Sequence, residues 1–459
     1  MKTSRRSVRC NTHAVPILRF EDQQSLTSFS GLVIFQKLFA VLDLKARLRN
    51  CFGHLHVHPI FGHGTVAALL ITHLLLGYRR LRDIDYYSDD PMVARLLGLR
   101  RLPDVATISR ALAQTDEVSV GKLRFLSRDL TLERLSSLCL ARVTLDFDGS
   151  VLSTGRRAEG TAIGFNKKKK GQRSYYPLFC TVAQTGQVLD VLHRPGNVHD
   201  SRGAAEFIAL CIGQIRALLP EATIEVRMDS AFFSEEIVSM LVRHKVEYTI
   251  SVPFERLPEL KALVEGRSRW RPVDDVHSCF ENSWKPKCWQ EQARFVLVRK
   301  RARLQHKEPV QLDLFIPHKY GYEFKVIVTN KTLGAGKLIA YHDGRGSQEG
   351  IFAELKTHCQ LEYVPTRTLA GNQTYMLCAI LAHNLGRELQ MMVNTPVRST
   401  NGKRAALWHF ATLETLRRTL VQRAGRLISP QGKLTLAMSA NEKTRTELLR
   451  YLDALDRAA

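Results

Sequence analysis

Acidic residues stand at the ends of two apolar segments, where their side chains could share a metal ion. Asp146 and Asp148 close one such segment, and Asp229 directly follows another at 225–228. Two carboxylates at neighbouring strand ends form a hard-oxygen site suited to Mg²⁺ or Mn²⁺. With a third acid from a helix, two bound ions can activate an attacking oxygen and stabilise the leaving oxygen of a phosphodiester. The pattern therefore predicts metal-dependent phosphodiester chemistry that needs no protein nucleophile.

The third acid is expected on a helix in the segment 341–356. Glu349 and Lys356 are seven residues apart, two helical turns, and so share one helical face. Arg345 lies one turn before Glu349, and a carboxylate flanked by cations suits metal binding beside phosphates. Glu354 is the competing acid, but it lies about 140° around the helix from Glu349 and is expected to face solvent. We therefore assign the third carboxylate to Glu349.

Other acids near the strand ends have interpretations that the residues alone leave open. Strand alternation points Asp146 and Asp148 to the same side, so both could line the site. Asp229 could instead cap the helix that follows it. Asp200 follows a strand and precedes a helix, so a helix cap explains it fully, although its neighbour His199 could bond near the site. We assign Asp229, and not Asp200, to the chemistry.

The elements that must position these acids alternate in a definite order. Three strands are followed by helix, strand, helix and strand, which is a three-strand meander followed by alternating units. This order predicts an α/β fold with a ribonuclease-H-like core, a mixed sheet with helices on both faces. The strands are expected at 142–147, 176–182, 188–192, 225–228 and 248–252, and the helices at 204–219 and 234–244.

Five regions follow from these patterns. Short helices joined by tight turns before residue 140, one of them capped by Asp104 or Thr107, suit a helix-turn-helix-like DNA-binding module and equally any small helical bundle. After the first part of the core, a mostly β insertion carries Trp284 and Trp289, which could stack on an unpaired base or be buried in the β core. The expected regions are an N-terminal helical DNA-binding region at 1–140 with helices at 32–42 and 65–78, the catalytic core at 141–254 and, as helix, at 336–390, the insertion at 255–335, and a basic helical C-terminal region at 391–459.

The charge balance points to a polyanionic partner. Lys and Arg number 67 against 44 acidic residues, giving a net charge of +23. Nucleic acid is the commonest partner for such an excess, with ribosomal and membrane-surface proteins as the other classes to weigh. The nine cysteines include no CxxC, as expected for reduced thiols of a cytosolic protein. The N-terminus lacks an apolar signal segment and no apolar stretch is long enough for a membrane span, so a soluble protein is expected.

Two clusters of basic side chains could contact DNA or bind a ligand. A loop between the first two strands contains Lys167, Lys168, Lys169, Lys170 and Arg173, followed by two tyrosines. A solvated charge run is the alternative, but a loop overhanging the catalytic face is expected to contact the DNA backbone. The histidines at 54, 56, 58 and 63 lack the spacing of a zinc finger. We expect them to form a solvated loop or to contact phosphate.

These segments together resemble the DDE transposases of the IS4-like superfamily, and most closely its IS1380 family. Members carry a Tyr, Arg, Glu, Lys signature on the helix of the third acid. This chain keeps Tyr341, Arg345, Glu349 and Lys356, with three residues between Tyr341 and Arg345 where the usual pattern has two. The segments 146–177 and 195–200 also resemble the family, and the likeness spans about 141–390 well and 30–140 more loosely. The family pattern, an Asp before a small hydroxyl-rich turn, favours Asp148 over Asp146.

The resemblance implies a transposase that binds the terminal inverted repeats of an insertion sequence. It implies double-stranded DNA as partner, both transposon ends and target, and at least a homodimer to synapse two ends. Water would free a 3′-OH at each element end, and that 3′-OH would attack target DNA. It also implies a bacterial, cytoplasmic protein that is nucleoid-associated when bound to DNA. The expected roles are Asp148, Asp229 and Glu349 as catalytic residues and ligands of two Mg²⁺ ions, with Mn²⁺ as a substitute, and Tyr341, Arg345 and Lys356 as DNA contacts.

Two other functions remain to be weighed against this one. A catalytically inactive DNA-binding repressor derived from a transposase would keep the fold and the basic surface. Metal-dependent nicking of end DNA would eliminate it. A related nuclease would cut without joining, and capture of a supplied 3′-OH end into a plasmid discriminates the two.

Overall fold

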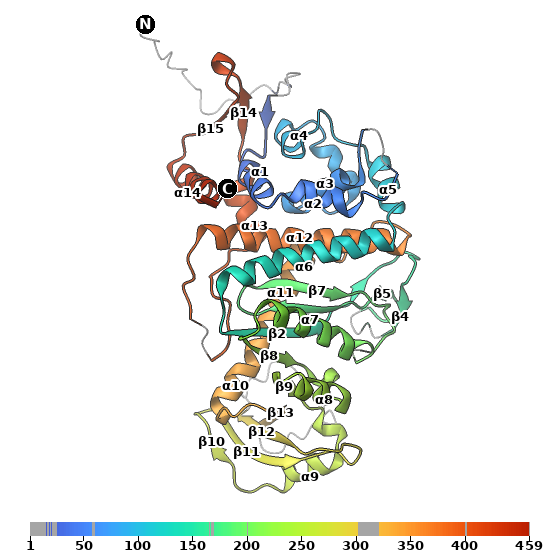
Figure 1. Cartoon of the computed structure of the whole chain (residues 1–459), viewed down its shortest axis with the longest axis vertical. Coiled ribbons are helices and arrows are strands. Elements are labelled where there is room, and N and C mark those ends of the chain that lie inside the picture. Colours follow the sequence, from blue (N-terminus) through green and yellow to red (C-terminus); the bar gives the residue numbers. More distant parts are fainter. Residues whose placement is uncertain are drawn as a thin grey trace.

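A nine-stranded mixed sheet forms the scaffold of this computed structural model (Figure 1). The structure describes residues 15, 18, 20, 25–56, 60–164, 166, 169–199, 201–301, 321–399 and 402–458. The strand order is β10-β11-β12-β13-β9-β8-β2-β6-β7. Its strands are β2 (Arg142–Gly149), β6 (Leu178–Val182), β7 (Gln187–Leu192), β8 (Thr223–Met228), β9 (Glu247–Ser251), β10 (Arg271–Pro272), β11 (His277–Trp284), β12 (Ala293–Arg301) and β13 (Tyr322–Thr329).

The strands predicted for the core all form. β2, β6 and β7 make an antiparallel meander, and β8 and β9 join β2 in parallel through helical crossovers. β6 is buried along its whole length, as are the middle residues of β2 and β8. Near-continuous burial is typical of strands that are covered on both faces. The mixed sheet with helices on both sides confirms the α/β class.

The two faces of the sheet belong to two separate apolar cores. Alternate residues of β2, including Phe147, pack with α7 (Ala204–Leu218), α8 (Glu235–Arg243) and α9 (Pro258–Gly266). The rings of Phe147 and Phe207 meet edge to face with centroids 6.0 Å apart. The other face is covered by α6 (Glu117–Leu138), α11 (Ser347–Thr357) and α12 (Leu369–Val393), where Phe352 packs on Phe179 at 5.2 Å. The acids of β2 lie on this second face, because side chains alternate along a strand.

The predicted insertion at 255–335 does not form a sheet of its own. β13 pairs antiparallel with β9, Ile327 opposite Ser251, so β10 to β13 extend the core sheet. The mostly β composition was predicted correctly, with strands at 293–298 and 324–329 expected and β12 and β13 found there. A shared edge explains the continuity, since an unpaired β9 would expose a row of backbone donors and acceptors.

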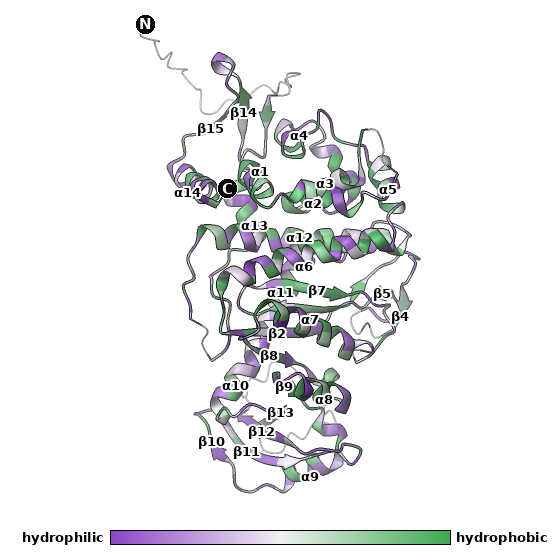
Figure 2. Cartoon of the chain, viewed as in Figure 1, coloured by the Kyte–Doolittle hydropathy of each residue, from purple (hydrophilic) through white to green (hydrophobic). Residues whose placement is uncertain are grey.

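The N-terminal region is a bundle of short helices packed on α12. Its helices are α1 (Leu32–Val41), α2 (Leu44–Cys51), α3 (His63–Leu76), η1 (Leu81–Tyr86), α4 (Pro91–Leu97) and α5 (Val105–Ala113). Every residue of α3 except Thr65 is buried, and Figure 2 shows α3 and α12 as largely hydrophobic ribbons. The helices predicted at 32–42 and 65–78 are confirmed, and Asp104 rather than Thr107 is the cap of α5. None of the helices in the described ranges is both long and apolar enough to cross a membrane.

The C-terminal region was predicted to be helical, and this is wrong for its middle part. After α13 (Leu413–Leu416) and η5 (Arg417–Val421), the chain forms the hairpin β14 (Gly425–Ile428) and β15 (Thr435–Met438) before α14 (Glu442–Ala458). β14 pairs with β1 (Leu26–Thr27) near the start of the chain. Arg417, one of the cations of this basic region, is buried and donates to the carbonyl oxygens of Leu74 and Leu75. The two ends of the chain therefore build one unit with the helical bundle.

Asp90 ties the strand β1 to the bundle, and its removal is expected to destabilise the fold. Its carboxylate caps α4 by accepting from the amides of Met92 and Val93, and it also accepts from Thr27 and Ser28. Asp90→Ala leaves these donors unpaired in a buried place, so we expect a loss of roughly 2 kcal/mol or more in the free energy of unfolding. Urea denaturation measures it. The exposed cap Asp104 is the matched control, with Asp104→Ala costing about 1 kcal/mol. Equal losses for the two variants would contradict the coupling of β1 to α4.

Candidate active site at the ends of β2 and β8

The two strand-end carboxylates predicted from the sequence occupy matching positions. In the parallel pair β2 and β8, Asp146 is opposite Arg227 and Phe147 is opposite Met228. Asp148 and Asp229 come next in this register, at the same edge of the sheet, and both are half-buried. Parallel strands end at one edge, so the structure brings the two carboxylates to neighbouring positions.

Each of these carboxylates is oriented by a nearby backbone amide. Oδ1 of Asp148 accepts from the amide of Gly149 at 2.8 Å, and Oδ1 of Asp229 accepts from the amide of Ala231 at 3.0 Å. The second bond caps the short helix η2 (Ser230–Phe232). The capping role considered for Asp229 is therefore present alongside its place at the strand end.

The helix of the third acid is held against the end of β2 by three side chains. From β13 the chain continues through α10 (Ala335–Asp343) and η4 (Gly344–Gly346) into α11. Nη1 of Arg345 donates to Oδ2 of Asp148 at 3.1 Å, and Nε2 of Gln348 donates to the backbone oxygen of Asp146 at 3.0 Å. Nζ of Lys356 donates to the backbone oxygen of Val151 at 3.1 Å. α11 is thereby fixed beside the two strand ends.

Glu349 stands one turn after Arg345 on this helix and is exposed. It forms no hydrogen bond or ion pair with any residue that the structure describes. A carboxylate in the first turn of a helix also faces the positive end of the helix dipole. Its negative charge is therefore available to a ligand.

A buried ion pair lies directly beneath the two strand-end acids. Arg227 donates to both carboxylate oxygens of Asp146, Nε to Oδ1 at 2.6 Å and Nη2 to Oδ2 at 2.7 Å. Asp146 is 1% exposed, so it does not line the site together with Asp148. Burial raises the pKa of Asp146, and the charge and hydrogen bonds of Arg227 oppose that rise. Asp146 therefore acts in packing and not in ligand binding.

The same guanidinium reaches two further elements. Its Nη1 donates to the backbone oxygens of Tyr341 at 3.0 Å and of Lys403 at 2.8 Å. Arg227 thus joins β2, β8, the end of α10 and the segment after 402. This role was not predicted from the sequence, although one signal was present, a charged residue between Val226 and Met228 inside an apolar strand. A charge in such a position is retained only with a buried partner.

The side chains of Asp148, Asp229 and Glu349 are of the type that binds a divalent metal ion. Three carboxylates supply the hard oxygen ligands that Mg²⁺ and Mn²⁺ prefer, and Asp148 already attracts the cation of Arg345. Across the described residues, no three His, Cys, Asp or Glu side chains are gathered closely enough to hold a metal ion. The residues fit the ion in type, and Glu349 would have to approach the strand ends to complete the set.

Comparison with known proteins assigns the chain to a family. The model of the family described as "Transposase DDE domain group 1" matches residues 16–459. The chain belongs to this family of DDE transposases. Membership places the chain in DNA transposition and recombination and among polynucleotidyl transferases, whose members typically use a divalent metal. It does not distinguish the IS1380 family from its neighbours.

Two solved structures resemble the chain distantly. One is a cryo-EM structure of the piggyBac transposase synaptic complex with hairpin DNA, 12% identical, with 95% of this chain and 88% of that chain covered and a TM-score of 0.40. The other is a crystal structure of a pre-cleavage Mos1 transpososome, 11% identical, with 37% and 57% covered and a TM-score of 0.17. No curated protein matches the chain.

Tyr341, expected in this transposase as a DNA contact, is instead fully buried. Its side chain has 0% exposure, and its hydroxyl has no hydrogen-bond partner in the described structure. Three cations lie near its ring, Lys331 at 4.4 Å, Arg227 at 5.4 Å and Arg404 at 5.9 Å from the centroid. Burial raises the pKa of Tyr341 well above its usual value, so the phenol is neutral. The predicted contact is wrong for this conformation, and the residue packs behind the site.

Tyr341→Phe is therefore expected to leave DNA binding by the transposase unchanged. The substitution removes a buried hydroxyl that has no partner and keeps the ring between its cations. The free energy of unfolding should stay the same or rise by up to about 1 kcal/mol, because an unsatisfied polar group is removed. Anisotropy titration with duplex DNA and urea denaturation measure the two quantities. Tyr341→Ala, which empties the buried site, should cost about 3 kcal/mol or more. Weaker DNA binding by Tyr341→Phe would restore the predicted contact.

Glu354 was expected to face solvent, and this is wrong. It is 7% exposed, forms an ion pair with Arg387 of α12 and accepts from the amide of Leu413 at 2.9 Å. Its position faces α12 because α11 is packed between that helix and the sheet. Glu354 therefore joins helices, which leaves Glu349 as the exposed acid of α11.

The basic loop is described only in part. Lys167 and Lys168 lie outside the described residues, while Lys169 and Lys170 are exposed. Arg173 is half-buried, and its guanidinium donates to the hydroxyl of Thr161 at 2.9 Å. It begins β5 (Arg173–Tyr175), which lies between β3 (Leu152–Ser153) and β4 (Ala162–Ile163) in a small three-stranded sheet. The lysines keep their expected role as a proposal, whereas Arg173 supports the loop.

The remaining alternatives are decided by burial and pairing. Trp289 is buried and stacks on Phe233 at 4.8 Å, and the half-buried Trp284 donates to Glu259, so both pack within the β region.

Among the histidines, His54 is paired with Asp116 at 3.0 Å. His58 and Asp200 lie outside the described residues. The residue at the N-cap of α7 is Gly203.

Proposed function

We propose that this transposase binds the terminal inverted repeats of its own insertion sequence and catalyses metal-dependent DNA cleavage and strand transfer. Asp148, Asp229 and Glu349 are its catalytic carboxylates. The observation that carries the proposal is the register of β2 and β8, which puts Asp148 and Asp229 at neighbouring strand ends. The contact of Arg345 with Asp148, which holds the helix of Glu349 at the same edge, supports it further.

The core of the transposase is proposed to be ribonuclease-H-like. In the order β7-β6-β2-β8-β9, the first three strands are antiparallel and the last three parallel, with α7 and α8 as crossovers. This is the meander followed by alternating units that the sequence predicts. The region before residue 140 is proposed to contact DNA, as its short helices and its many cations favour.

The three carboxylates would hold Mg²⁺, with Mn²⁺ as substitute and two ions as the expected number. When bound, the ions would supply charge stabilisation for both oxygens of the displacement. Arg345 of η4 and Lys356 of α11 flank Glu349 along the chain and would position phosphates, since both are half-buried beside the end of β2. Arg345 neutralises Asp148 in their absence, so its guanidinium would turn from the carboxylate to a DNA phosphate. Without the metal ions and these cations, the negative charge of the carboxylates would repel the DNA backbone.

Two phosphodiester displacements account for the reaction. In the first, the oxygen of water bonds to the scissile phosphorus, the bond between phosphorus and the 3′ oxygen breaks, and the leaving oxygen takes up a proton. In the second, the freed 3′-OH loses its proton and bonds to a phosphorus of target DNA, releasing a 3′-OH of the target. Each step exchanges one phosphorus–oxygen bond for another and needs no oxidant. Two ends must react together, so a homodimer is proposed.

The test is cleavage and joining with a labelled duplex of the element end. With Mg²⁺, the protein should nick this duplex at the end and join a supplied 3′-OH end to a plasmid. Binding without nicking would instead identify a repressor, and nicking without joining a nuclease. The same duplex with a scrambled terminal sequence is the control for recognition of the repeat.

A further inference from the structure

Four exposed arginines lie outside the site described above and form no ion pair with a residue that the structure describes. Arg110 is on α5, Arg156 and Arg157 follow β3 (Leu152–Ser153), and Arg367 precedes α12. We call them the arginine track. Within the described ranges none of the four forms an ion pair, and only two donate hydrogen bonds from the side chain, Arg110 to Ala106 and Thr107 and Arg156 to Pro365. Unpaired cations held outward are suited to a polyanion.

Hydrogen bonds and strand pairing join the track to the candidate active site. Lys356 of α11 donates to the backbone oxygen of Val151, the residue before β3. β3 pairs with β5 (Arg173–Tyr175), which pairs with β4 (Ala162–Ile163). Asn166 donates to Ser153 at 2.8 Å, so the loop that carries Lys169 and Lys170 lies against β3 as well. The path from Asp148 therefore continues directly onto the small sheet.

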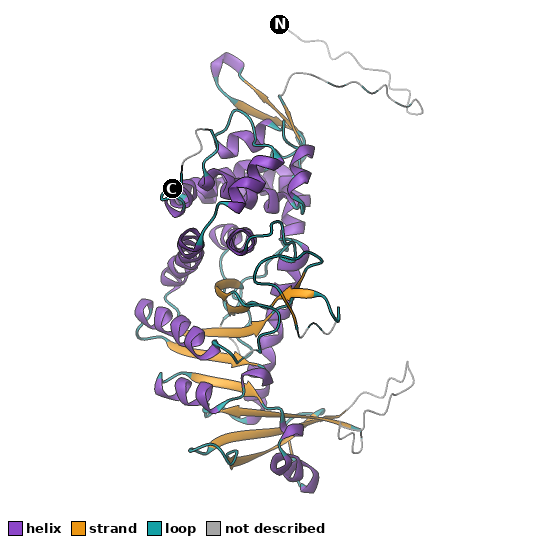
Figure 3. Cartoon of the chain, turned by 90° about the vertical axis from the view of Figure 1, so that its right-hand side faces the viewer, coloured by secondary structure: helices purple, strands orange, loops and turns teal. Residues whose placement is uncertain are grey.

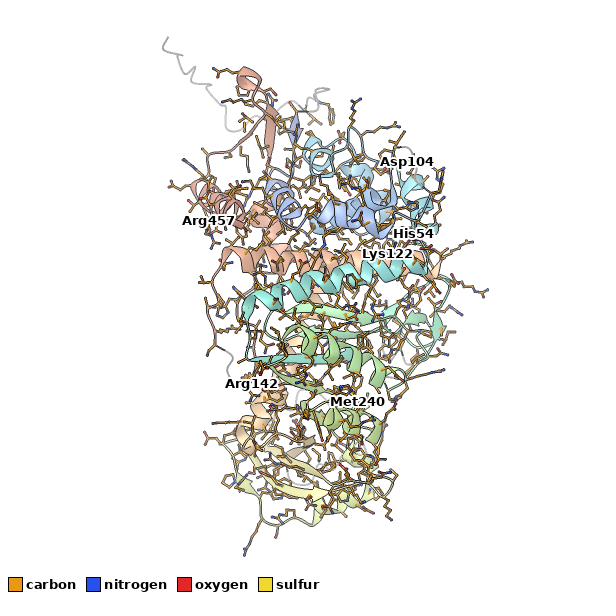
Figure 4. All side chains as sticks on the ribbon, in the orientation of Figure 1. His54, Asp104, Lys122, Arg142, Met240 and Arg457 are labelled. Carbon is orange, nitrogen blue, oxygen red and sulfur yellow. The ribbon has the colours of Figure 1, made fainter. Side chains whose placement is uncertain are left out.

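The small sheet is joined in turn to α5. Glu159 accepts from the amide of Leu369 at 2.9 Å, and its own amide donates to the backbone oxygen of Arg367 at 2.8 Å. The start of α12 lies against the end of α5, where a Cβ added at Gly371 would be 2.6 Å from the oxygen of Leu112. Figure 1 shows α5, β4 and β5 along one side of the molecule, and Figure 3 views that side. The side chain of Arg142, the first residue of β2, lies away from this side in Figure 4.

Two acidic groups along this path are engaged elsewhere, and a third, Asp104 at the cap of α5, lies near Arg110. The hydrogen bonds of Thr107 and the charge of Arg110 lower the pKa of Asp104. Glu159 is engaged with the backbone of α12, and Glu362 pairs with Lys356 at 3.3 Å. Elsewhere in the molecule cations gather around an acid, as Arg142, Lys331 and Arg404 do around Glu225. Burial alone would raise the pKa of Glu225, but the hydrogen bonds of Arg404 and Lys331 outweigh it and lower that pKa to about 2. The track differs in offering its charge to solvent.

We propose that the arginine track binds the phosphate backbone of duplex DNA between the active-site edge and helix α5. This proposal rests on the proposed function in one respect: it assumes that the same duplex places its scissile phosphate at Asp148. Duplex DNA carries one charge for about every 1.7 Å of its axis, so a row of arginines meets successive phosphates. An acidic protein would need a complementary set of carboxylates, whereas any DNA sequence supplies the charges. The track is therefore a sequence-independent DNA contact of the element end.

The test compares salt dependence of binding between charge-matched variants. The probe is a labelled duplex of the element end, and anisotropy titrations at several salt concentrations give the slope of log K against log salt. For Arg156→Gln/Arg157→Gln/Arg367→Gln, the slope should fall in magnitude by about 2–3, because each phosphate contact contributes about 0.9. The control is Arg243→Gln/Lys245→Gln/Arg269→Gln, which removes the same charge from exposed residues at the end of α8, just after it, and beyond α9. Its slope should match that of the wild type.

The outcomes separate this inference from the proposed function. An unchanged slope for the track variant, or an equal fall for the control, would overturn the track. Wild-type protein that does not distinguish the element end from a scrambled duplex would overturn recognition of the repeat, and the slopes measured on the scrambled duplex would still decide the track. If the triple variant fails to fold, the salt slopes of the single variants Arg157→Gln and Arg367→Gln provide the test. Neither side chain hydrogen-bonds a described residue, and each should lower the slope by about 0.9.

Discussion

Asp229→Asn is expected to abolish cleavage of a labelled element-end duplex while leaving binding of that duplex intact. Asp148→Asn and Glu349→Gln should do the same. Each substitution keeps the size of the side chain and removes one anionic oxygen from the proposed metal set. Losing about 4 kcal/mol of transition-state charge stabilisation slows a reaction ~10³-fold, so cleavage should fall by at least that factor. Single-turnover cleavage with Mg²⁺ and anisotropy titration on the same duplex measure the two effects.

Two acids outside the set serve as controls for this result. Glu265→Gln changes an exposed acid of α9 far from the strand ends, and it should cut at the wild-type rate. Glu354→Gln changes the buried acid of the same helix as Glu349, and it should lower the free energy of unfolding without abolishing cleavage below the melting transition. Variants of the three proposed acids that cut as well as the wild type would place the metal site elsewhere. Loss of duplex binding in all three would make the carboxylates structural.

The candidate site could be predicted from local patterns because its parts are local. Asp148 and Asp229 each follow an apolar strand, and the order of strands is enough to place the two strand ends at one edge. Glu349 follows from helical spacing within a single helix. These inferences need only the periods of strand and helix and the rule that parallel strands share an edge.

The parts that failed depend on contacts between distant segments. Spacing along α11 cannot say that Glu354 faces Arg387, because α12 begins well after α11 ends. The burial of Tyr341 is decided by Lys331 and Arg404, which come from other elements. The hairpin β14–β15 was taken for helix because its partner β1 lies at the opposite end of the chain. None of these pairings leaves a periodic trace in the sequence.

The bounds of one long helix were also missed. The helix α6 has 22 residues, and the helical pattern predicted before residue 140 did not mark its bounds. It packs against β7 on one side and α12 on another, so apolar residues occur around much of its circumference. A helix with apolar residues on several sides lacks the single stripe that sequence patterns detect. The insertion was recognised as β, but its continuity with β9 depends on a pairing that only the folded chain reveals.

Arg227→Met is expected to have the largest effect on stability of any single substitution considered. The variant leaves Asp146 buried without its partner and removes the donors to the carbonyl oxygens of Tyr341 and Lys403. Breaking a buried ion pair by removing one member costs about 3–5 kcal/mol, and each orphaned carbonyl adds to it. We therefore expect a loss of about 4 kcal/mol or more in the free energy of unfolding, measured by urea denaturation. Arg227→Lys keeps the charge but not the two-pronged geometry and should lose less.

A double variant separates the ion pair from the rest of the contacts of Arg227. In Asp146→Leu/Arg227→Met both charges are gone, so the desolvation penalty of a lone carboxylate disappears. The double variant should be more stable than Arg227→Met by about 2 kcal/mol or more, although the two carbonyl oxygens remain unpaired and keep it below the wild type. Additive losses from Asp146→Leu and Arg227→Met would mean that the pair is not coupled, against the two hydrogen bonds that join it. Because the pair sits two residues behind Asp148 and Asp229 on both strands, a coupled result would also explain why a charge is retained inside β8: the pair fixes the strand ends that carry the proposed catalytic carboxylates.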